Sequence, residues 1–483
     1  MHIGLPPFKI LALAPFSPYL ETDNPPLITT DPLAVDQALA ELNPTLDIPL
    51  DPKVYPAASI NISISRLADF RPKNIKKQPA FKAICGQLEK ESDTVHPIPP
   101  APKSSTALDD ILSMVDSGQP QQPAAGSNAE PQINSCLLQT IFTHPAFRKM
   151  ESAWRGLELL ARQVPSDSKC NVELILVPVT EHNLLAALEK ITDSLSSSPP
   201  DITLLDHSLS NSPLSIKILD KIMTVSEQIL TPVFVDFGPK FFEIGSWTEI
   251  DRLPFVPTQL EGAEYGHWKT LRQQPAAGWV IGCAGKLMGR AMHKPEEGFS
   301  SSLSETEPLW LSSVWGAAAL CASSLAENGR TTLFANHSDT RLGGLPLTDG
   351  RNPSPVIPSL NTERIKDFRL AGINTFAFSG DQAFLLGAVS IDGGQANLRF
   401  YLSRLIHFLI QLSAEKRKDF TDLEPQLTEA VSLFLQQQGY PEPYDLSIKK
   451  GEPSTDSVLL EISITPGPEI LPGNTPISFS FNW

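Results

Sequence analysis

The spacing of apolar side chains predicts alternating strands and helices in the middle of the chain. Residues 173–177, 201–205 and 232–237 are short apolar runs, and two amphipathic stretches, residues 181–195 and 214–230, separate them. Short apolar runs bounded by turn residues are typical of buried strands, and strands that alternate with helices of this length are typical of βαβ units. We therefore expect an α/β fold with parallel strand pairing in this region.

The first 90 residues follow a different pattern. Residues 8–15 form an apolar run that ends in proline, which predicts a buried strand, and residues 59–65 alternate polar and apolar side chains as a half-buried strand does. A capped helix is expected over residues 32–42, and residues 67–72 are expected to lead into another helix that runs to about residue 90. Together these elements predict a smaller α/β unit over residues 1–90.

Residues 91–131 have the composition of a linker. They are rich in Pro, Gly, Gln, Ser and Ala and contain few side chains that could form a core. Residues 104–115 are the exception, because Ala107, Ile111 and Val115 would share one face of a helix. That helix would be either a small docking helix or a transient linker helix, and the pattern alone leaves both open.

Beyond the linker, longer helices and two terminal strands are expected. The helices cover residues 136–164, with an interruption near a proline, 309–328 and 397–414, and the strands cover residues 457–465 and 476–482. Both strands alternate as half-exposed strands do. Such a terminal pair can stay within its own chain or extend the sheet of a neighbouring subunit. By pattern, the chain divides into residues 1–90, 91–131, 132–450 and 451–483.

The composition excludes several classes of protein. The chain has 483 residues and a formal net charge of −16, from 38 Lys and Arg against 54 Asp and Glu, which argues against a broad nucleic-acid surface or an anionic membrane as partner. No run approaches the ~18 apolar residues of a membrane span, and the first residues lack a signal-peptide pattern. We therefore expect a cytoplasmic protein without membrane insertion. The 45 prolines, almost twice the usual share of ~5%, predict stiff loops and broken elements.

No metal or cofactor site is predicted. The five cysteines lie far apart and form neither a CxxC pair nor a Cys/His pair at metal-ligand spacing, so free, buried thiols are expected. The GCAGK segment at residues 282–286 resembles a phosphate loop only superficially, because its glycine spacing is wrong and no Ser or Thr follows Lys286.

No catalytic residues are predicted either. His144 and His407 are expected to be hydrogen-bonded packing residues. Ser208 and Ser210 stand near an Asp-His pair, but no GxSxG motif supports a nucleophile there. Asp236, in the last of the three predicted strands, is the best isolated acid, and a helix-cap or loop role is favoured for it over catalysis.

Several motifs resemble those of a known family. Residues 143–157 read THPAFRKMESAWRGL, which resembles the HPxFxxLExxWRGL signature of the large contractile-sheath subunit of type VI secretion. Further segments resemble that family in its own order, although the PRFLxRxPY motif is degraded here; they are residues 275–290, 309–318, 341–346, 362–384 and 398–409. The resemblance to the large subunit therefore extends over roughly residues 133–483.

The N-terminal region resembles the small sheath subunit of the same system. Residues 5–16 are similar to its opening strand, and residues 62–75 are similar to its FKSLxDFxPxxI segment. In the usual system the two subunits are separate chains that form a heterodimer, whereas here both resemblances fall on one chain. The small-subunit part lacks its C-terminal helix and strand, which normally help to interlace neighbouring protomers.

The resemblance implies a contractile-sheath-like fold with mixed sheets flanked by helices, and a structural role without catalysis. Such a subunit would polymerise into a tube around an inner tube and contract to drive its ejection. Its partners would be other sheath subunits, the inner tube protein, the baseplate and a Clp-family disassembly ATPase, for which residues 104–115 are a candidate helix. Trp154, Arg155 and Trp315 would be packing and ion-pair residues.

Two other functions remain open at this point. The missing interlacing elements favour a sheath-derived adaptor that serves the baseplate or a regulatory role and does not polymerise. The βαβ pattern is also compatible with an α/β enzyme, and a deep pocket with convergent acids would support that hypothesis.

Overall fold

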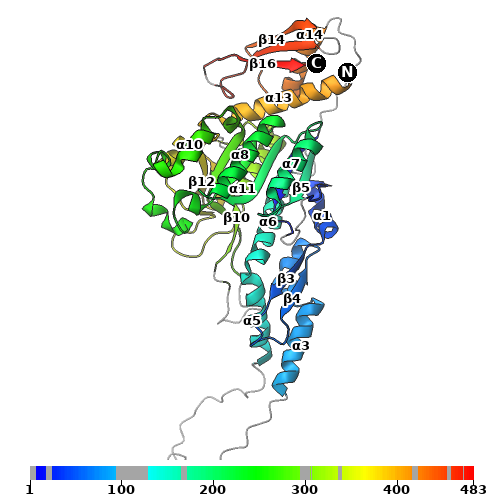
Figure 1. The fold of residues 1–483 in the computed structure, drawn as a ribbon, viewed down its shortest axis with the longest axis vertical. Helices are drawn as coiled ribbons and strands as arrows, with labels where there is room; N and C mark the ends of the chain where they lie inside the picture. Colours follow the sequence, from blue (N-terminus) through cyan, green and yellow to red (C-terminus); the bar gives the residue numbers. More distant parts are fainter. Residues whose placement is uncertain are drawn as a thin grey trace, which may run out of the picture.

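The computed structural model describes residues 7–17, 24–93, 129–164, 171–293, 305, 307–335, 340–415, 423–453, 458–471 and 473–483. Most of the predicted linker, including residues 104–115, lies outside the described residues. Its two ends belong to helices α3 (Pro79–Asp93) and α5 (Ala129–Thr143). Figure 1 shows the arrangement: a large central sheet, a small N-terminal hairpin at one end and a C-terminal sheet at the other.

An eight-stranded mixed sheet is the centre of the described structure, and its order is β13-β12-β8-β7-β6-β1-β5-β2. The parallel strands are β5 (Val172–Pro178), β1 (Phe8–Ala14), β6 (Ile202–Leu209), β7 (Val233–Phe237), β8 (Val280–Ala284) and β12 (Ile373–Ser379). The antiparallel edges are β2 (Ile28–Thr30) and β13 (Gln382–Leu385). The predicted α/β fold with a mixed sheet and parallel βαβ pairing is confirmed.

Strand β1 lies inside this sheet, between β6 and β5. Phe8 pairs with Val172 of β5, and Ile10 pairs with Ile202 of β6. This corrects the prediction of a self-contained unit over residues 1–90, because the first strand shares its core with residues after 170. Its FKILALA sequence is apolar on both faces, as a central parallel strand requires, but that pattern does not reveal its partners.

The rest of the N-terminal region forms small elements beside α5 and α6. Strands β3 (Thr45–Pro49) and β4 (Ser59–Ser63) make a two-stranded sheet. The predicted capped helix is present as a 3₁₀ turn, η1 (Pro32–Ala34), and α1 (Val35–Leu42), and the Asp31 side chain accepts a hydrogen bond from the Leu33 amide at 2.7 Å.

The helix expected to follow residues 67–72 and to run to about residue 90 is interrupted. Three shorter helices occupy this segment: η2 (Leu67–Phe70), α2 (Pro72–Ile75) and α3. Pro72 and Pro79 each open a helix, because proline has no amide hydrogen to give to the preceding turn and is tolerated only in the first turn.

Helices cover both faces of the central sheet. On one face α6 (Pro145–Arg162) and α11 (Ser313–Asn328) share a hydrophobic cluster with Ile10 and Ala12 of β1. On the other, α7 (Leu184–Leu195) and α8 (Pro213–Gln228) share a cluster with Leu11 and Leu13. The predicted break at Pro145 is confirmed, since it separates α5 from α6.

A single helix was predicted for residues 309–328, and this prediction is wrong. Their first residues form β10 (Leu309–Ser312), which pairs with β9 (Lys286–Arg290), and β11 (Val356–Ile357) completes that small sheet. The remaining described elements are short helices: η3 (Pro239–Phe242), η4 (Trp247–Arg252), α9 (Val256–Leu260), η5 (Ala263–Tyr265), α10 (Gly266–Arg272), η6 (Pro275–Trp279) and α12 (Thr362–Leu370).

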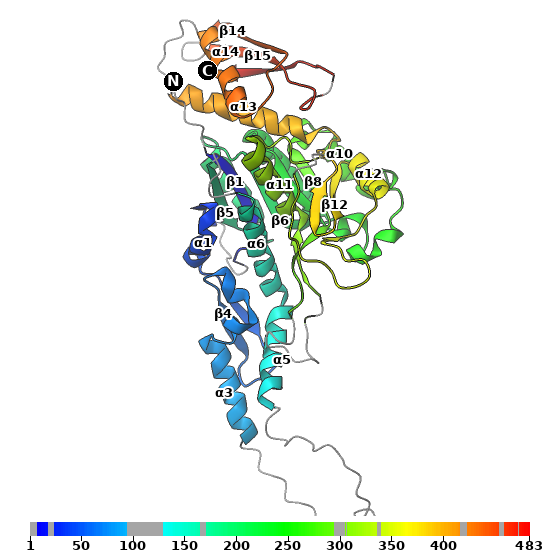
Figure 2. The same ribbon diagram turned by 180° about the vertical axis from the view of Figure 1, so that it is seen from behind.

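The C-terminal part has its own hydrophobic cluster. Helices α13 (Ala396–Glu415) and α14 (Leu423–Gln437) pack on a sheet in the order β14-β15-β16. The strands are β14 (Asp445–Pro453), β15 (Val458–Thr465) and β16 (Ile477–Asn482). Both predicted terminal strands are confirmed and pair antiparallel, but the expected boundary at residue 451 falls inside β14, which the sequence pattern missed. Figure 2 shows α13 between this sheet and the central one.

Two further findings concern membrane-spanning helices and the cysteines. Among the described helices, none is long and apolar enough to cross a bilayer. Cys283 and Cys321 are free and buried, as predicted, Cys85 is also buried, and Cys136 is free and half-buried.

Candidate functional site

A cavity of about 910 Å³ opens at the carboxyl ends of the parallel strands. Pro15 after β1, Val179 after β5, Asp206 in β6 and Asp236 in β7 line it. After β1 the chain forms β5 on one side of it and then β6 on the other, so the strand order changes direction at β1. In open α/β sheets, ligands bind outside the carboxyl ends of the strands at such a switch point.

Strand β6 is irregular where it borders the cavity. Leu205 pairs with Val235 of β7, whereas Ser208 pairs with Asp236, so Asp206 and His207 are extra residues on β6. A bulge of this kind bends the strand and changes the direction of its side chains, and bulges are frequent beside functional sites.

The Asp206 carboxyl lies on the cavity wall and is tied to the helix layer. Its Oδ2 accepts a hydrogen bond from Nε1 of Trp315 at 2.7 Å. Burial raises the pKa of Asp206 to about 6, although the Trp315 hydrogen bond and the charges of Lys286 and Lys149 act in the opposite direction.

The Asp236 carboxyl is more deeply buried, with 4% of its surface exposed. Burial raises its pKa to about 7, and the neighbouring Asp206 charge adds to that rise, while Lys286 and hydrogen bonds from Ser208 and Ser312 lower it. Its Oδ1 has no hydrogen-bond partner among the described residues. The helix-cap or loop role predicted for Asp236 is wrong, because this residue is part of β7.

Other residues singled out in the sequence also lie at the cavity. His144, Ser208 and Ser210 line it, together with Lys286 at the start of β9. The parallel alignment of β6 and β7 places Ser208 beside Asp236, and α6 and β9 bring His144 and Lys286 to the same cavity. Sequence spacing could not show this arrangement. His407 lies elsewhere, with Nε2 3.1 Å from the Ile229 carbonyl oxygen, as the packing role predicted for it requires. In the part of the chain that the structure describes, no cluster of His, Cys, Asp and Glu is arranged to hold a metal ion.

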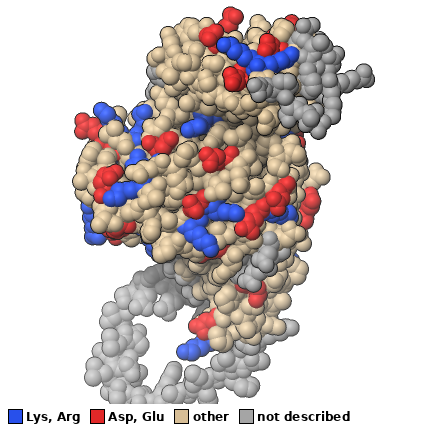
Figure 3. All heavy atoms as spheres, turned by 45° about the horizontal axis from the view of Figure 1, so that its top comes forward, with Lys and Arg blue, Asp and Glu red and all other residues tan. Residues whose placement is uncertain are grey.

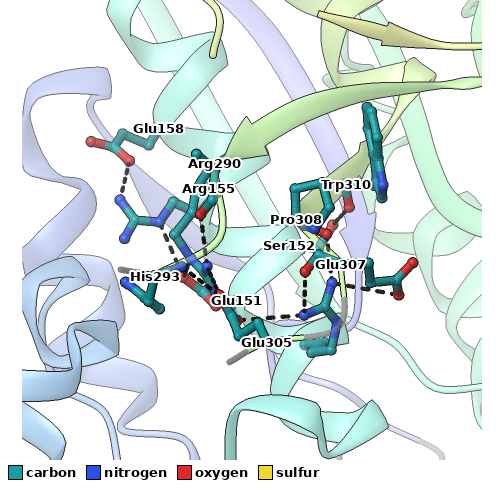
Figure 4. A network of polar contacts seen from close by, with 12 residues as sticks. Glu151, Ser152, Arg155, Glu158, Arg290, His293, Glu305, Glu307, Pro308 and Trp310 are labelled. Atoms are coloured by element: carbon teal, nitrogen blue, oxygen red, sulfur yellow. Dashed lines mark hydrogen bonds and ion pairs between the residues drawn. The ribbon is translucent and has the colours of Figure 1, made fainter. Parts of the chain in front are cut away.

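A buried ionic network joins α6 to β9 (Figure 4). Arg290 donates to both carboxylate oxygens of Glu151, each at 2.8 Å, and also to both oxygens of Glu305, at 2.7 and 2.9 Å. Neither glutamate side chain is exposed. Burial alone would raise the pKa of Glu151, but the hydrogen bonds and charge of Arg290 outweigh it and hold the pKa below its ordinary value.

The network extends along α6. Arg155 lies 3.6 Å from Glu151 and 3.2 Å from Glu158, and Arg148 lies 3.5 Å from Glu305. Sequence reasoning missed this cluster, because Arg290 and Glu151 are 139 residues apart. The ion-pair role predicted for Arg155 is confirmed.

The two tryptophans that resembled family positions are buried in the same layer. Trp154 donates from Nε1 to the Phe16 carbonyl oxygen at 3.0 Å, and Trp315 donates to Asp206. Both therefore pack in the core, as predicted, and the indole Nε1 of each has a hydrogen-bond acceptor.

A second buried ion pair joins α13 to the amino end of β6, at the end of the central sheet opposite the cavity. Arg404 donates to Asp201 Oδ1 at 2.7 Å, and the Lys9 amide donates to Asp201 Oδ2 at the same distance. Burial acts to raise the pKa of Asp201, but Arg404 and His407 hold it below its ordinary value. This contact connects the C-terminal part to the start of β6.

The outer edge of β16 offers unpaired backbone groups. Val458 and Trp483 exchange two backbone hydrogen bonds. In an antiparallel pair every second residue bonds to the partner strand, so Ile477, Phe479, Phe481 and Trp483 point their backbone groups toward β15. The amides and carbonyls of Ser478, Ser480 and Asn482 consequently point away from β15. No other described strand pairs with β16 on that side.

The other edge of the sheet, β14, is different. The Lys450 amide donates to the Glu424 carboxylate of α14 at 2.6 Å, so a side chain covers part of that edge. Side chains that cover an edge oppose pairing with another chain, and β16 is therefore the more open template for an added strand.

Comparison with known proteins identifies one part of the chain. Residues 130–336 match the family model VipB, described as EvpB/VC_A0108, tail sheath N-terminal domain. Among solved structures, the sheath tail protein of Desulfitobacterium hafniense aligns at 11% identity with a TM-score of 0.34. That alignment covers 63% of this chain and 60% of the solved chain. No curated protein matches.

The matched region holds α6, strands β5, β6, β7 and β8 of the central sheet, and α11. In this part of its chain the protein is therefore similar to a tail sheath N-terminal domain.

Proposed function

We propose that the protein is a structural subunit of a type VI secretion contractile sheath. It polymerises into a tube around an inner tube, and contraction of that tube drives ejection of the inner one. The observation that carries the proposal is the VipB-family tail sheath domain over residues 130–336. The open β16 edge supports it, since repeated addition of a neighbour's strand at a fixed rotation generates a helical assembly.

In this proposal one chain combines both sheath subunits. Residues 1–90 correspond to the small subunit, residues 91–131 join the two, residues 132–450 form the large-subunit core, and residues 451–483 contribute inter-subunit contacts. The position of β1 supports the fusion, because a strand from the first part completes the sheet of the second. Partners would be other sheath subunits, the inner tube protein, the baseplate and a Clp-family ATPase.

Ser480→Pro tests the role of the β16 edge. Proline removes an amide hydrogen that points away from β15, so the fold should tolerate it, as edge strands tolerate proline on their solvent side. It should nevertheless prevent strand addition by a neighbour. We expect electron microscopy and sedimentation of protein expressed with its neighbouring genes to show tubes for the wild type and none for Ser480→Pro.

Ser480→Ala is the matched control, because it changes the same side chain and keeps the amide hydrogen. It should form tubes as the wild type does. Tubes formed by folded Ser480→Pro would contradict the edge as the assembly contact. Wild-type protein that never forms tubes but co-purifies with baseplate proteins would instead support the alternative, a sheath-derived adaptor that does not polymerise.

A further inference from the structure

The cavity at the carboxyl ends of the parallel strands is open to solvent and measures about 910 Å³, which lies within the range of small-molecule sites. Sheath assembly through β16 makes no use of it, because β16 lies on the C-terminal sheet beyond α13. The cavity therefore needs an explanation of its own.

The charges that line the cavity nearly balance. Its lining includes four Asp or Glu residues and four Lys or Arg residues, and because the pKa of Asp236 lies at about 7, only a small positive surplus remains at neutral pH. A site for phosphate esters would show a clear excess of cations, and a site for polyamines would show an excess of carboxylates. The lining thus favours a ligand without net charge.

The lining is also dense in hydroxyl groups and in carboxylate acceptors. Six serines and one threonine contribute to it, beside Asp206 and Asp236. Asp236 is almost fully buried, and its Oδ1 has no donor among the described residues, although leaving a buried acceptor unpaired is costly. Several of the serine hydroxyls already donate within the protein, so a ligand that carries several hydroxyl groups would act as a donor, both to the carboxyls and to the serine oxygens.

One wall is aromatic. Trp310 of β10 lines the cavity together with Leu309. An indole ring provides a large, flat apolar surface, against which the carbon-bound hydrogens of a sugar ring can pack while its hydroxyl groups face polar side chains. We propose that this cavity binds a neutral saccharide, with Trp310 as the stacking wall and Asp206 and Asp236 as hydroxyl acceptors.

The full-length protein tests this proposal with sugars of different charge. Maltose and N-acetylglucosamine are the neutral probes, glucosamine is the cationic probe and glucose 6-phosphate is the anionic probe. Ligand-observed NMR and titration calorimetry should show binding of a neutral probe with a Kd of about 1 mM or below, and weaker binding of both charged probes. Absence of binding by both neutral probes, or tighter binding of a charged one, would overturn the proposal.

Variants locate the binding. Asp236→Asn removes one carboxylate acceptor with little change of shape, and Trp310→Ala removes the stacking wall; each should weaken binding about tenfold or more. Asp251→Asn and Tyr444→Ala change an exposed acid and an exposed aromatic side chain elsewhere and should leave the Kd unchanged. Circular dichroism checks that each variant folds. Unchanged affinity in folded Asp236→Asn and Trp310→Ala would place the sugar outside this cavity. Tube formation tests the sheath proposal separately.

Discussion

At the joint between α6 and β9, single residues carry charge on buried side chains. Glu151 is fully buried and remains ionised because Arg290 gives it two hydrogen bonds and Arg155 lies nearby. A buried ion pair contributes little beyond what apolar packing would, but removing one partner leaves the other charge unsatisfied. The network therefore favours one position of β9 against α6, since any other would leave a buried charge unpaired.

Glu151→Gln should destabilise the protein by about 2–3 kcal/mol at neutral pH, since Arg290 loses a charged partner but keeps Glu305. Urea unfolding measures the change. Glu158→Gln is the control, because that side chain is part of partly exposed ion pairs on the same helix; its effect should stay within about 0.5 kcal/mol.

The loss of stability caused by Glu151→Gln should depend on pH. A carboxyl whose pKa is lowered in the folded state stabilises the fold above its unfolded pKa, here the ordinary 4.5, and that contribution is lost as pH falls through the folded value. The stability difference between wild type and Glu151→Gln should therefore shrink below pH 4.5. A difference that stays constant into acid would show that the Glu151 charge does not contribute.

At the scale of elements, the close approach of α6 and α11 depends on a glycine. Gly156 faces the indole ring of Trp315, and a Cβ at this position would overlap that ring. Both residues lie in segments where the sequence resembles sheath motifs, but only the packed helices show that they meet. Small residues at a helix crossing allow the backbones to come close, and a larger one has to displace its neighbour.

Gly156→Ala should destabilise the protein by about 1–3 kcal/mol, because the added methyl group overpacks against Trp315. Gly86→Ala is a matched control in another helix, where a Cβ would meet nothing within 4 Å. The control should be neutral or stabilising by up to about 1 kcal/mol, since alanine favours helix over glycine. Thermal and urea unfolding measure both, and equal effects at the two positions would contradict the packing argument.

At the scale of the whole molecule, α13 connects two hydrophobic cores. The C-terminal cluster and the central sheet are separate, and the Arg404–Asp201 ion pair is a buried contact between them. On the face that Figure 3 shows, acidic and basic side chains are interspersed, so the net charge of −16 does not gather into one patch there. Load applied to the C-terminal sheet by a neighbour would pass through α13 to β6.

Arg404→Met should destabilise the protein by about 3–5 kcal/mol, because it leaves the Asp201 carboxylate buried without its cation. The double variant Arg404→Met/Asp201→Asn should recover much of that loss, since the uncompensated charge is gone. Arg162→Met, which changes an exposed arginine, is the control. Equilibrium unfolding measures all of them, and a double variant less stable than the single one would contradict the argument.

Much of the fold was predictable from local pattern. The apolar runs that became β1, β5, β6 and β7, and the alternation of β15 and β16, were visible because burial on one or both faces leaves a signature in consecutive residues. The prediction of one helix leading on from residues 67–72 to about residue 90 was wrong because prolines there open new helices. Strand β14, with Lys449 and Lys450 beside two apolar residues, gave no comparable signal.

The candidate sites were less predictable. Asp236 was noticed as an acid, but its nearness to Asp206 and Lys286 arises only when β6, β7 and β9 assemble. The Glu151–Arg290 pair and the Arg404–Asp201 pair likewise join residues 139 and 203 positions apart. Motifs could identify the sheath resemblance, whereas no spacing could identify these contacts.

The sequence by itself determined the α/β class, the position of most strands and helices, and the resemblance to sheath proteins, because short-range periodicity and motif order are properties of neighbouring residues. Only the tertiary structure decided that β1 belongs in the central sheet, that the carboxyl ends of β6 and β7 frame a polar cavity, and that β16 is an open edge. Those features depend on which distant segments pair, and pairing is chosen by the burial and hydrogen bonding of the whole chain at once.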